Sequence, residues 1–168
     1  MTPALEEMLV EAIRLYNYPA VTYDLLDERE RWFPSMRDLE SYLQTLLTAH
    51  DVKSVESGLA GVLYWGHYRA GYKSDRVRKF RSTVTDKHLR QAIMAFPALR
   101  GSGLMDLRNL RLPQFTYMAF LTKLRTFLDP GRYCVLDSKV ASLMPLSARL
   151  KCQKTYIPVT VQNERAYD

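Results

Sequence analysis

The sequence predicts an all-α protein, and three kinds of observation support this. Apolar residues recur at three- and four-residue spacing over most of the chain. Ser or Thr precedes several of these segments, where it can cap a helix, and Pro or Gly follows them. The chain has 168 residues, of which 47% are hydrophobic, and this is enough for one buried core. We therefore expect a compact single domain of about eight short helices over residues 1–168.

Four helices are expected in the first 70 residues. The first runs from Pro3 to about Tyr16, with proline in its first turn and apolar residues along one face. A short helix is expected over Asp24–Trp32, where Phe33-Pro34 stops it. Ser35 caps a third helix that reaches about His50. A fourth, rich in small and apolar residues, runs from Ser54 to about Tyr68.

The second half of the chain continues the same pattern. Residues 73–83 are basic and fit either a helix or a loop. The tail has a β-branched run without an evident strand partner, and Asn163–Tyr167 has the pattern of an opening helix. We therefore expect the native chain to continue beyond Asp168. The other expected helices are Thr85–Phe96, capped by Thr85, a short one over Leu104–Leu110 ended by Pro113, Phe115–Leu128 and Ser138–Leu150.

Charge is unevenly distributed along the chain, whose formal net charge is +6. Residues 1–59 carry five Lys/Arg and eleven Asp/Glu, whereas residues 60–168 carry nineteen and seven. A basic segment of this size suits an anionic partner. Cys134 and Cys152 are too few for a disulfide scaffold and are predicted to be reduced thiols of a cytoplasmic protein. No signal peptide or membrane-spanning run is evident, and no zinc, P-loop or dinucleotide motif, so we expect no membrane, metal or cofactor.

Basic and aromatic residues interleave between Tyr64 and Arg90. This pattern suits contact with phosphates combined with base stacking, although a solvated charged face over core aromatics has the same pattern. Trp65 in particular fits the core better than a base platform. The predicted phosphate-contacting residues here are Arg69, Lys73, Arg76, Lys79 and Arg81, and the candidates for a base pocket are Trp65, Tyr68 and Tyr72.

Lys123 and Asp137 are the candidate catalytic residues. A helical wheel puts Lys123 just beyond Phe127 at the edge of an apolar stripe, where partial desolvation would favour its neutral, nucleophilic form. The ordinary alternative is a lysine whose stem covers the core while its ammonium reaches water. Asp137 precedes an amphipathic helix, so it is either a plain N-cap or a carboxylate held rigidly at the mouth of the core.

Together these residues resemble the catalytic segment of the helix-hairpin-helix base-excision DNA glycosylases, in particular the 8-oxoguanine DNA glycosylase-like members. Cys134-Val-Leu-Asp137-Ser-Lys-Val140 is similar to their V-P-V-D-x-H-V loop, and Leu121-Thr-Lys123 to their Gly-x-Lys. The phrase LTKLRTFLDPGRYCVLDSKVA also resembles a divergent bacterial group. Two features depart from the family: the Gly-rich hairpin is reduced to Leu112-Pro113-Gln114-Phe115, and the fourteen residues from Lys123 to Asp137 are about one helical turn short.

The resemblance implies a two-lobed helical glycosylase with a degenerate hairpin, acting as a monomer near the nucleoid. It implies double-stranded DNA carrying a damaged or modified base as partner, with an oxidised purine as the default substrate. Asp137 would stabilise the developing sugar cation, Lys123 would supply an associated lyase activity, and Ser138 and Lys139 would contact DNA. Three alternatives remain open: a phage-defence glycosylase for hypermodified bases, a non-catalytic DNA-binding protein on this scaffold, and a protein-interaction module that uses the acidic first third.

Overall fold

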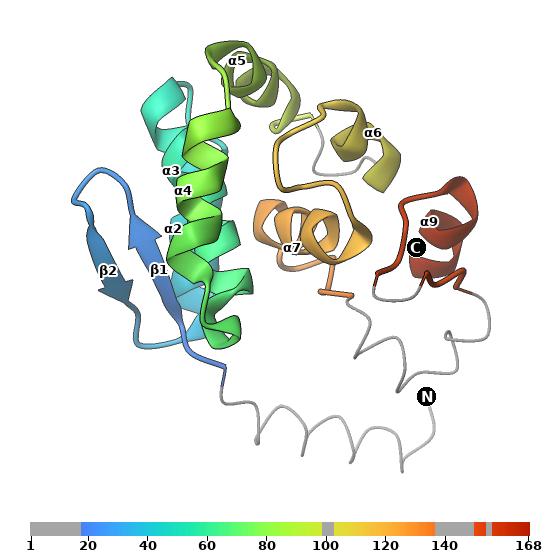
Figure 1. Cartoon of the computed structure of the whole chain (residues 1–168), viewed down its shortest axis with the longest axis horizontal. Coiled ribbons are helices and arrows are strands. Elements are labelled where there is room, and N and C mark those ends of the chain that lie inside the picture. Colours follow the sequence, from blue (N-terminus) through green and yellow to red (C-terminus); the bar gives the residue numbers. More distant parts are fainter. Residues whose placement is uncertain (1–17, 99–102, 137–149, 154–155) are drawn as a thin grey trace.

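The structure, a computed structural model, describes residues 18–98, 103–136, 150–153 and 156–168 (Figure 1). The chain is mostly helical, with one small two-stranded antiparallel sheet in its described part. The expected helix over 3–16 lies outside the described residues, as does the one expected over 138–150 except for its last residue. The elements are β1 (Val21–Asp24), β2 (Arg29–Trp32), α2 (Met36–Leu47), α3 (Val52–Gly66), η1 (Tyr68–Ala70), α4 (Lys73–Thr83), α5 (Asp86–Ala95), α6 (Leu104–Asn109), α7 (Met118–Leu128) and α9 (Val161–Tyr167).

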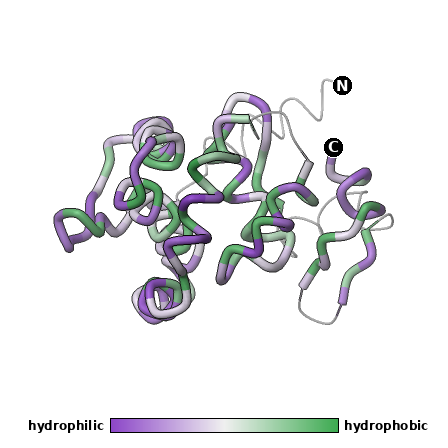
Figure 2. Tube along the Cα trace, turned by 90° about the horizontal axis from the view of Figure 1, so that it is seen from above, coloured by the Kyte–Doolittle hydropathy of each residue, from purple (hydrophilic) through white to green (hydrophobic). Residues whose placement is uncertain are grey.

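Helix α3 is at the centre of the fold. It contacts α2, α4, α5, α7 and β1, and every residue from Ser57 to Trp65 is buried. Helices α2 and α5 beside it have one apolar and one polar side. Hydrophobic and hydrophilic residues alternate along the helices in Figure 2. A helix that is buried on all sides needs small residues where its neighbours come close. At Gly61 an added Cβ would lie 2.5 Å from Thr22 Oγ1 and 2.6 Å from Leu43 Cδ2.

The two predicted capping residues begin their helices as expected. Ser35 Oγ accepts a hydrogen bond from the Asp38 amide at the start of α2. Thr85 Oγ1 accepts one from the His88 amide, and the His88 ring accepts one from the Thr85 amide in return, which completes a capping box at α5. The basic residues 73–83 form a helix, α4. Helix α3 begins at Val52, two residues earlier than the predicted start at Ser54, because Asp51 caps it.

The short helix expected over Asp24–Trp32 is wrong, because this segment belongs to a β-hairpin. Strands β1 and β2 pair in antiparallel register from Val21 opposite Trp32 to Asp24 opposite Arg29. Asp24 forms the turn: its Oδ1 accepts hydrogen bonds from the amides of Leu26 and Asp27, and Glu28 has a left-handed φ of 51°. Strand β1 is largely buried against α3, whereas all four residues of β2 are exposed.

A buried carboxylate joins this hairpin to helix α2. Asp24 Oδ2 accepts a hydrogen bond of 2.5 Å from the Tyr42 hydroxyl, and Arg31 lies 3.6 Å away. Burial works to raise the pKa of Asp24, but hydrogen bonds from Tyr42 and the turn amides, together with Arg31, keep it below its usual value. Burial and the bond to Asp24 raise the pKa of Tyr42 to about 12. The carboxylate therefore stays ionised and holds the hairpin in place.

The C-terminal helices α6 and α9 are joined to the helices around α3 through α7. Helix α7 contacts α2, α3 and α6, and α6 in turn contacts α9, where the predicted opening helix is observed. The buried Asn163 side chain holds the preceding segment through hydrogen bonds to both the amide and the carbonyl of Lys151 and to the carbonyl of Pro158. The β-branched tail forms no strand in the described residues beyond an isolated bridge between Gln153 and Tyr156. No helix among the described residues is long and apolar enough to cross a bilayer.

Adding one methyl group at Gly61 tests the close packing around α3. We expect Gly61→Ala to lower the free energy of unfolding by about 1–3 kcal/mol, because Thr22 and Leu43 must move, and this loss exceeds the gain in helix propensity. Urea denaturation measures the change. Gly131→Ala is the matched control, since an added Cβ there meets nothing within 4 Å and should leave stability almost unchanged. Equal effects at the two positions would contradict the packing described.

Candidate functional site

Lys123 lies inside the protein rather than at the edge of an apolar stripe. Its exposure is 7%, and every residue of α7 from Leu121 to Leu128 is buried, including Arg125. The helical wheel separated one apolar face from two polar edges, but α7 is surrounded by α2, α3 and α6. Lys123 Nζ donates a hydrogen bond of 3.3 Å to the carbonyl of Ala119 and lies 4.9 Å from the centre of the Phe120 ring.

The end of α3 comes unusually close to this lysine. A Cβ at Gly66 would lie 2.9 Å from Lys123 Cδ and 2.7 Å from Phe120 Cε1. Glycine at this position therefore lets the lysine stem and the Phe120 ring pack directly on the backbone of α3. Any larger residue would displace one of them, so the position of Lys123 is set by α3 as much as by its own helix.

His67 follows Gly66 and packs on Phe120, the ring that also contacts Lys123. Its ring stacks on Phe120 with 4.4 Å between centroids and 27° between planes, and the Tyr72 ring is 5.1 Å away. Burial, and then the positive charges of Arg76 and Lys123, lower the pKa of His67 to about 4. The imidazole is therefore neutral at neutral pH. His67, Tyr72, Arg76, Phe120 and Lys123 are together called the Lys123 cluster below.

Arg76 links the Lys123 cluster to the segment 112–115. Its Nη1 donates a hydrogen bond of 3.3 Å to Gln114 Oε1, and its guanidinium lies 5.1 Å from the centre of the Tyr72 ring. Gln114 and Arg111 both have left-handed φ values, 69° and 51°, so the backbone turns tightly twice here. A pocket of about 490 Å³ lies at this turn, with Arg108 and Arg111 in its lining.

Thr122, the neighbour of Lys123, holds the chain that leads to Asp137. Thr122 Oγ1 accepts a hydrogen bond of 3.0 Å from the Leu136 amide and donates one of 3.1 Å to the Leu136 carbonyl. Leu136 is also 4% exposed, so this point of the chain is fixed by both packing and hydrogen bonds. Asp137 itself, with Ser138 and Lys139, lies outside the described residues.

The predicted base-pocket residues differ in their positions. Trp65 is in the core, 5% exposed, with edge-to-face contacts to Tyr18 and Phe127, so it has no free ring face for a base and we withdraw it. Tyr68 is half-buried, with its ring 3.6 Å from Lys73 Nζ. Tyr72 is 44% exposed and belongs to the Lys123 cluster, so it alone of the three combines an accessible ring with that cluster.

Lys73, a predicted phosphate contact, instead binds the hairpin. Its Nζ lies 2.7 Å from Glu30 Oε1, which also accepts a hydrogen bond from the Tyr64 hydroxyl. Burial opposes the charge, but the bonds to Glu30 and Tyr64 outweigh it and raise the pKa of Lys73 above its usual value. The lysine is therefore charged, but its charge is used within the protein, which argues against a primary role in phosphate contact.

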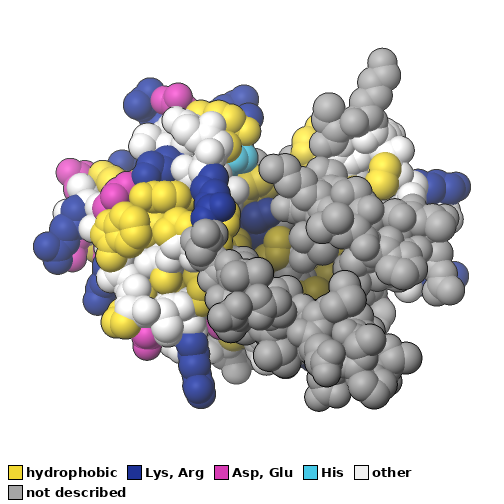
Figure 3. All heavy atoms as spheres, turned by 90° about the horizontal axis from the view of Figure 1, so that it is seen from below, with side chains coloured by type: hydrophobic (Ala, Val, Ile, Leu, Met, Phe, Trp, Pro, Cys, Tyr) yellow, Lys and Arg dark blue, Asp and Glu magenta, His cyan; other side chains and the backbone are white. Residues whose placement is uncertain are grey.

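The remaining predicted cations lie apart, Arg69 on η1 and Lys79 and Arg81 on different sides of α4. Arg69, Lys79 and Arg81 are all exposed. Arg69 packs over the Tyr18 ring at 5.1 Å, and Arg81 lies 3.8 Å from Glu56. Figure 3 shows lysine and arginine side chains beside hydrophobic patches on one face of the molecule. The basic stretch is thus not one continuous patch.

Sequence reasoning missed the residues that complete the site. His67 lies in the middle of the basic and aromatic stretch, but a lone histidine there has no motif that marks it. Gly66, Phe120 and Thr122 had no motif of their own, because their roles depend on contacts between α3, α7 and the chain before Asp137. Cys134 and Cys152 are free and exposed, in line with the prediction of unpaired thiols.

Comparisons with family models, curated proteins and solved structures found no match to this chain. Within the described residues, no group of three or more His, Cys, Asp and Glu side chains is arranged to hold a metal ion. The expectation that the protein uses no metal or cofactor stays a prediction.

The lowered pKa of His67 predicts a pH-dependent loss of stability. Between about pH 6.5 and pH 4 the unfolded chain binds a proton at this position and the folded chain does not, so stability falls as the pH falls. After allowance for partial solvent screening, we expect about 1 kcal/mol between pH 7 and pH 5. Urea denaturation at both values should show this extra loss in the parent and not in His67→Gln. His50→Gln, at an exposed histidine, should behave as the parent, and a loss that persists in His67→Gln would assign the effect elsewhere.

Proposed function

We propose that this protein is a DNA glycosylase that flips a damaged or modified base out of duplex DNA and excises it. The observation that carries the proposal is that Lys123 is buried on α7 while its neighbour Thr122 fixes the chain that enters Asp137. The resemblance assigns catalytic roles to these two residues. Anchoring of Leu136 beside Lys123 supports the view that they act together, in spite of their short separation in the sequence.

The reaction we propose begins when the Lys123 ammonium gives up its proton to solvent and the resulting amine attacks the anomeric carbon of the nucleotide. The N-glycosidic bond breaks, and its electron pair leaves with the base, which takes up a proton. Asp137 stabilises the positive charge that develops on the sugar. The sugar ring then opens: the C1′–O4′ bond breaks, O4′ takes up a proton, and loss of the amine protons leaves a C1′=N Schiff base, from which elimination of the 3′ phosphate can cut the strand. The neutral His67 ring adds no further positive charge beside the amine.

DNA would approach over the Lys123 cluster. Arg76 and the exposed ring of Tyr72 combine a cation with a stacking surface beside the lysine, which suits a nucleotide that has left the base stack. Arg69, Lys79 and the turn with Arg108 and Arg111 offer further phosphate contacts nearby in the fold. We propose an oxidised purine as the default substrate, with hypermodified bases as the alternative, and action as a monomer in the cytoplasm at the nucleoid.

Covalent trapping tests the role of Lys123. With borohydride and duplexes that carry 8-oxoguanine or other modified bases, we expect a protein–DNA adduct that Lys123→Gln abolishes, because the Schiff base needs this amine. Lys53→Gln, at an exposed lysine in the first turn of α3, is the matched control and should trap as the parent does. An undiminished adduct in Lys123→Gln would remove Lys123 from the mechanism.

Base release tests the role of Asp137 and separates catalysis from mere binding. We expect Asp137→Asn to bind the same duplexes within about threefold of the parent and to lose base release by a factor of about 100 or more, because it removes a transition-state charge. Filter binding and product analysis measure the two quantities. If the parent releases no base from the whole panel but binds undamaged duplex in a salt-sensitive way, the protein is a non-catalytic DNA-binding protein.

A further inference from the structure

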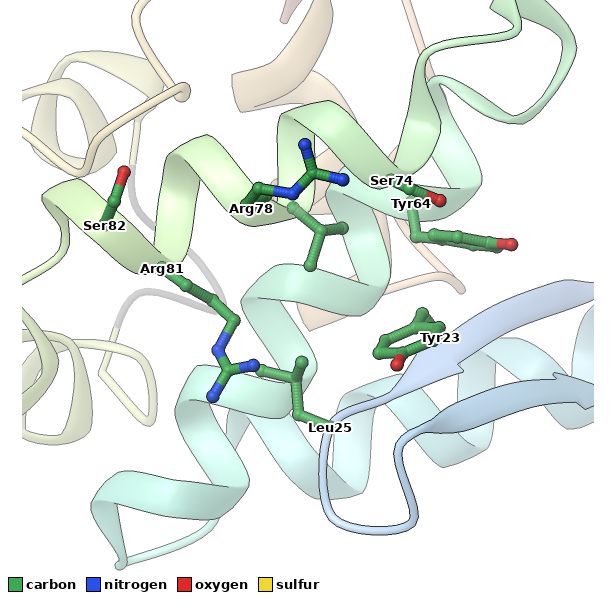
Figure 4. A pocket seen from close by; sticks show the side chains of 8 residues that line it. Tyr23, Leu25, Tyr64, Ser74, Arg78, Arg81 and Ser82 are labelled. Atoms are coloured by element: carbon green, nitrogen blue, oxygen red, sulfur yellow. The ribbon is translucent and has the colours of Figure 1, made fainter.

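A second pocket lies on the side of α4 away from the Lys123 cluster. It opens between the β-hairpin and α4 and has a volume of about 530 Å³ (Figure 4). Its lining includes Tyr23, Leu25, Tyr64, Val77, Arg78 and Arg81, and we call it the hairpin pocket. None of these residues contributes to the Lys123 cluster. The volume is many times the roughly 30 Å³ that one water occupies in the liquid, so a single small ion would leave the pocket mostly empty.

The floor of the hairpin pocket is aromatic and apolar. The rings of Tyr23 and Tyr64 lie with their centroids 5.7 Å apart and their planes tilted by 36°. At this separation the rings contact each other, so a planar group cannot enter between them and must pack against their outer surface. Tyr23 donates its hydroxyl hydrogen to the Glu28 carbonyl and Tyr64 bonds to Glu30, so both rings are held in place before any ligand arrives.

The α4 side of the hairpin pocket is cationic. Arg78 and Arg81 are one helical turn apart and both line the hollow; Figure 4 shows the Arg81 side chain extending from α4 toward Leu25, while that of Arg78 lies along α4. Their ion pairs are weak: Arg78 lies 3.1 Å from Asp75 with both side chains more than two-thirds exposed, and Arg81 lies 3.8 Å from Glu56. Each guanidinium therefore has N–H donors that can turn to a phosphate at little cost.

We propose that the hairpin pocket binds a nucleoside phosphate, either free or as one nucleotide of a single strand. The base packs on Tyr23 and Leu25, and the phosphate lies between Arg78 and Arg81. An apolar aromatic surface and two arginines in one pocket match both parts of such a ligand, whereas inorganic phosphate uses only the arginines and a nucleoside only the rings. The site is separate from the Lys123 cluster, so the inference does not depend on the proposed glycosylase activity.

Calorimetric titration of the full chain tests the proposal with four probes: AMP, adenosine, inorganic phosphate and a ten-residue thymidine oligonucleotide. We expect AMP to bind at least tenfold more tightly than adenosine or phosphate. Tighter binding of the oligonucleotide than of AMP assigns the site to a nucleic-acid strand, and the reverse assigns it to a free nucleotide. Phosphate that binds as tightly as AMP, or no binding of AMP and the oligonucleotide at millimolar concentration, overturns the proposal.

Variants at the pocket locate the binding. The double variant Arg78→Gln, Arg81→Gln should weaken AMP or oligonucleotide binding at least tenfold, and Tyr23→Leu should weaken it while leaving phosphate binding unchanged. Arg90→Gln removes an exposed arginine that is paired with Asp86 on α5, and this variant should bind as the parent does. Thermal unfolding confirms that each variant is folded. Unchanged binding in the folded double variant overturns the proposal, whereas borohydride trapping in the same variant reports on the Lys123 site separately.

Discussion

Two glycines of helix α3, Gly61 and Gly66, lie so close to neighbouring side chains that an added Cβ would come within 3 Å of them. At Gly61 these neighbours are Thr22 of β1 and Leu43 of α2, and at Gly66 they are Phe120 and Lys123 of α7. One buried helix therefore sets the position of the hairpin on one side and of the lysine on the other. Because interiors pack as tightly as crystals, a shift of α3 would move both.

A lysine in the core needs an explanation, since leucine would fill the same space without loss of hydration. The hydrogen bond of Lys123 to the Ala119 carbonyl and its contact with the face of the Phe120 ring offset part of this loss of hydration. Neither contact requires a lysine, because the carbonyl already belongs to the helix and a hydrophobic residue would pack on the ring equally well. The proposed role as nucleophile would give this buried amine a use in addition to its contacts.

Features that depend on neighbouring residues in the chain were predictable, and features that depend on distant contacts were not. Ser35 and Thr85 cap their helices through amides three residues away, so their roles can be read from the sequence. The hairpin was mistaken for a helix because β2 is exposed on all four residues and only the packing of β1 on α3 shows which side is buried. Likewise, a helical wheel treats α7 alone and cannot show that its polar residues are covered by other helices.

The number of basic residues on α4 says less about binding than the direction in which each one points. At about 100° per residue, the buried Val77 and Phe80 lie between two pairs of cations, Arg76 with Lys79 and Arg78 with Arg81. The first pair lies on the side of the Lys123 cluster and the second on the side of the hairpin pocket, while Lys73 pairs with Glu30. A flat DNA surface seated on one pair faces away from the other, because the two pairs lie on roughly opposite sides of the helix. Two separate sites for anionic groups therefore account for the charge of α4 better than one.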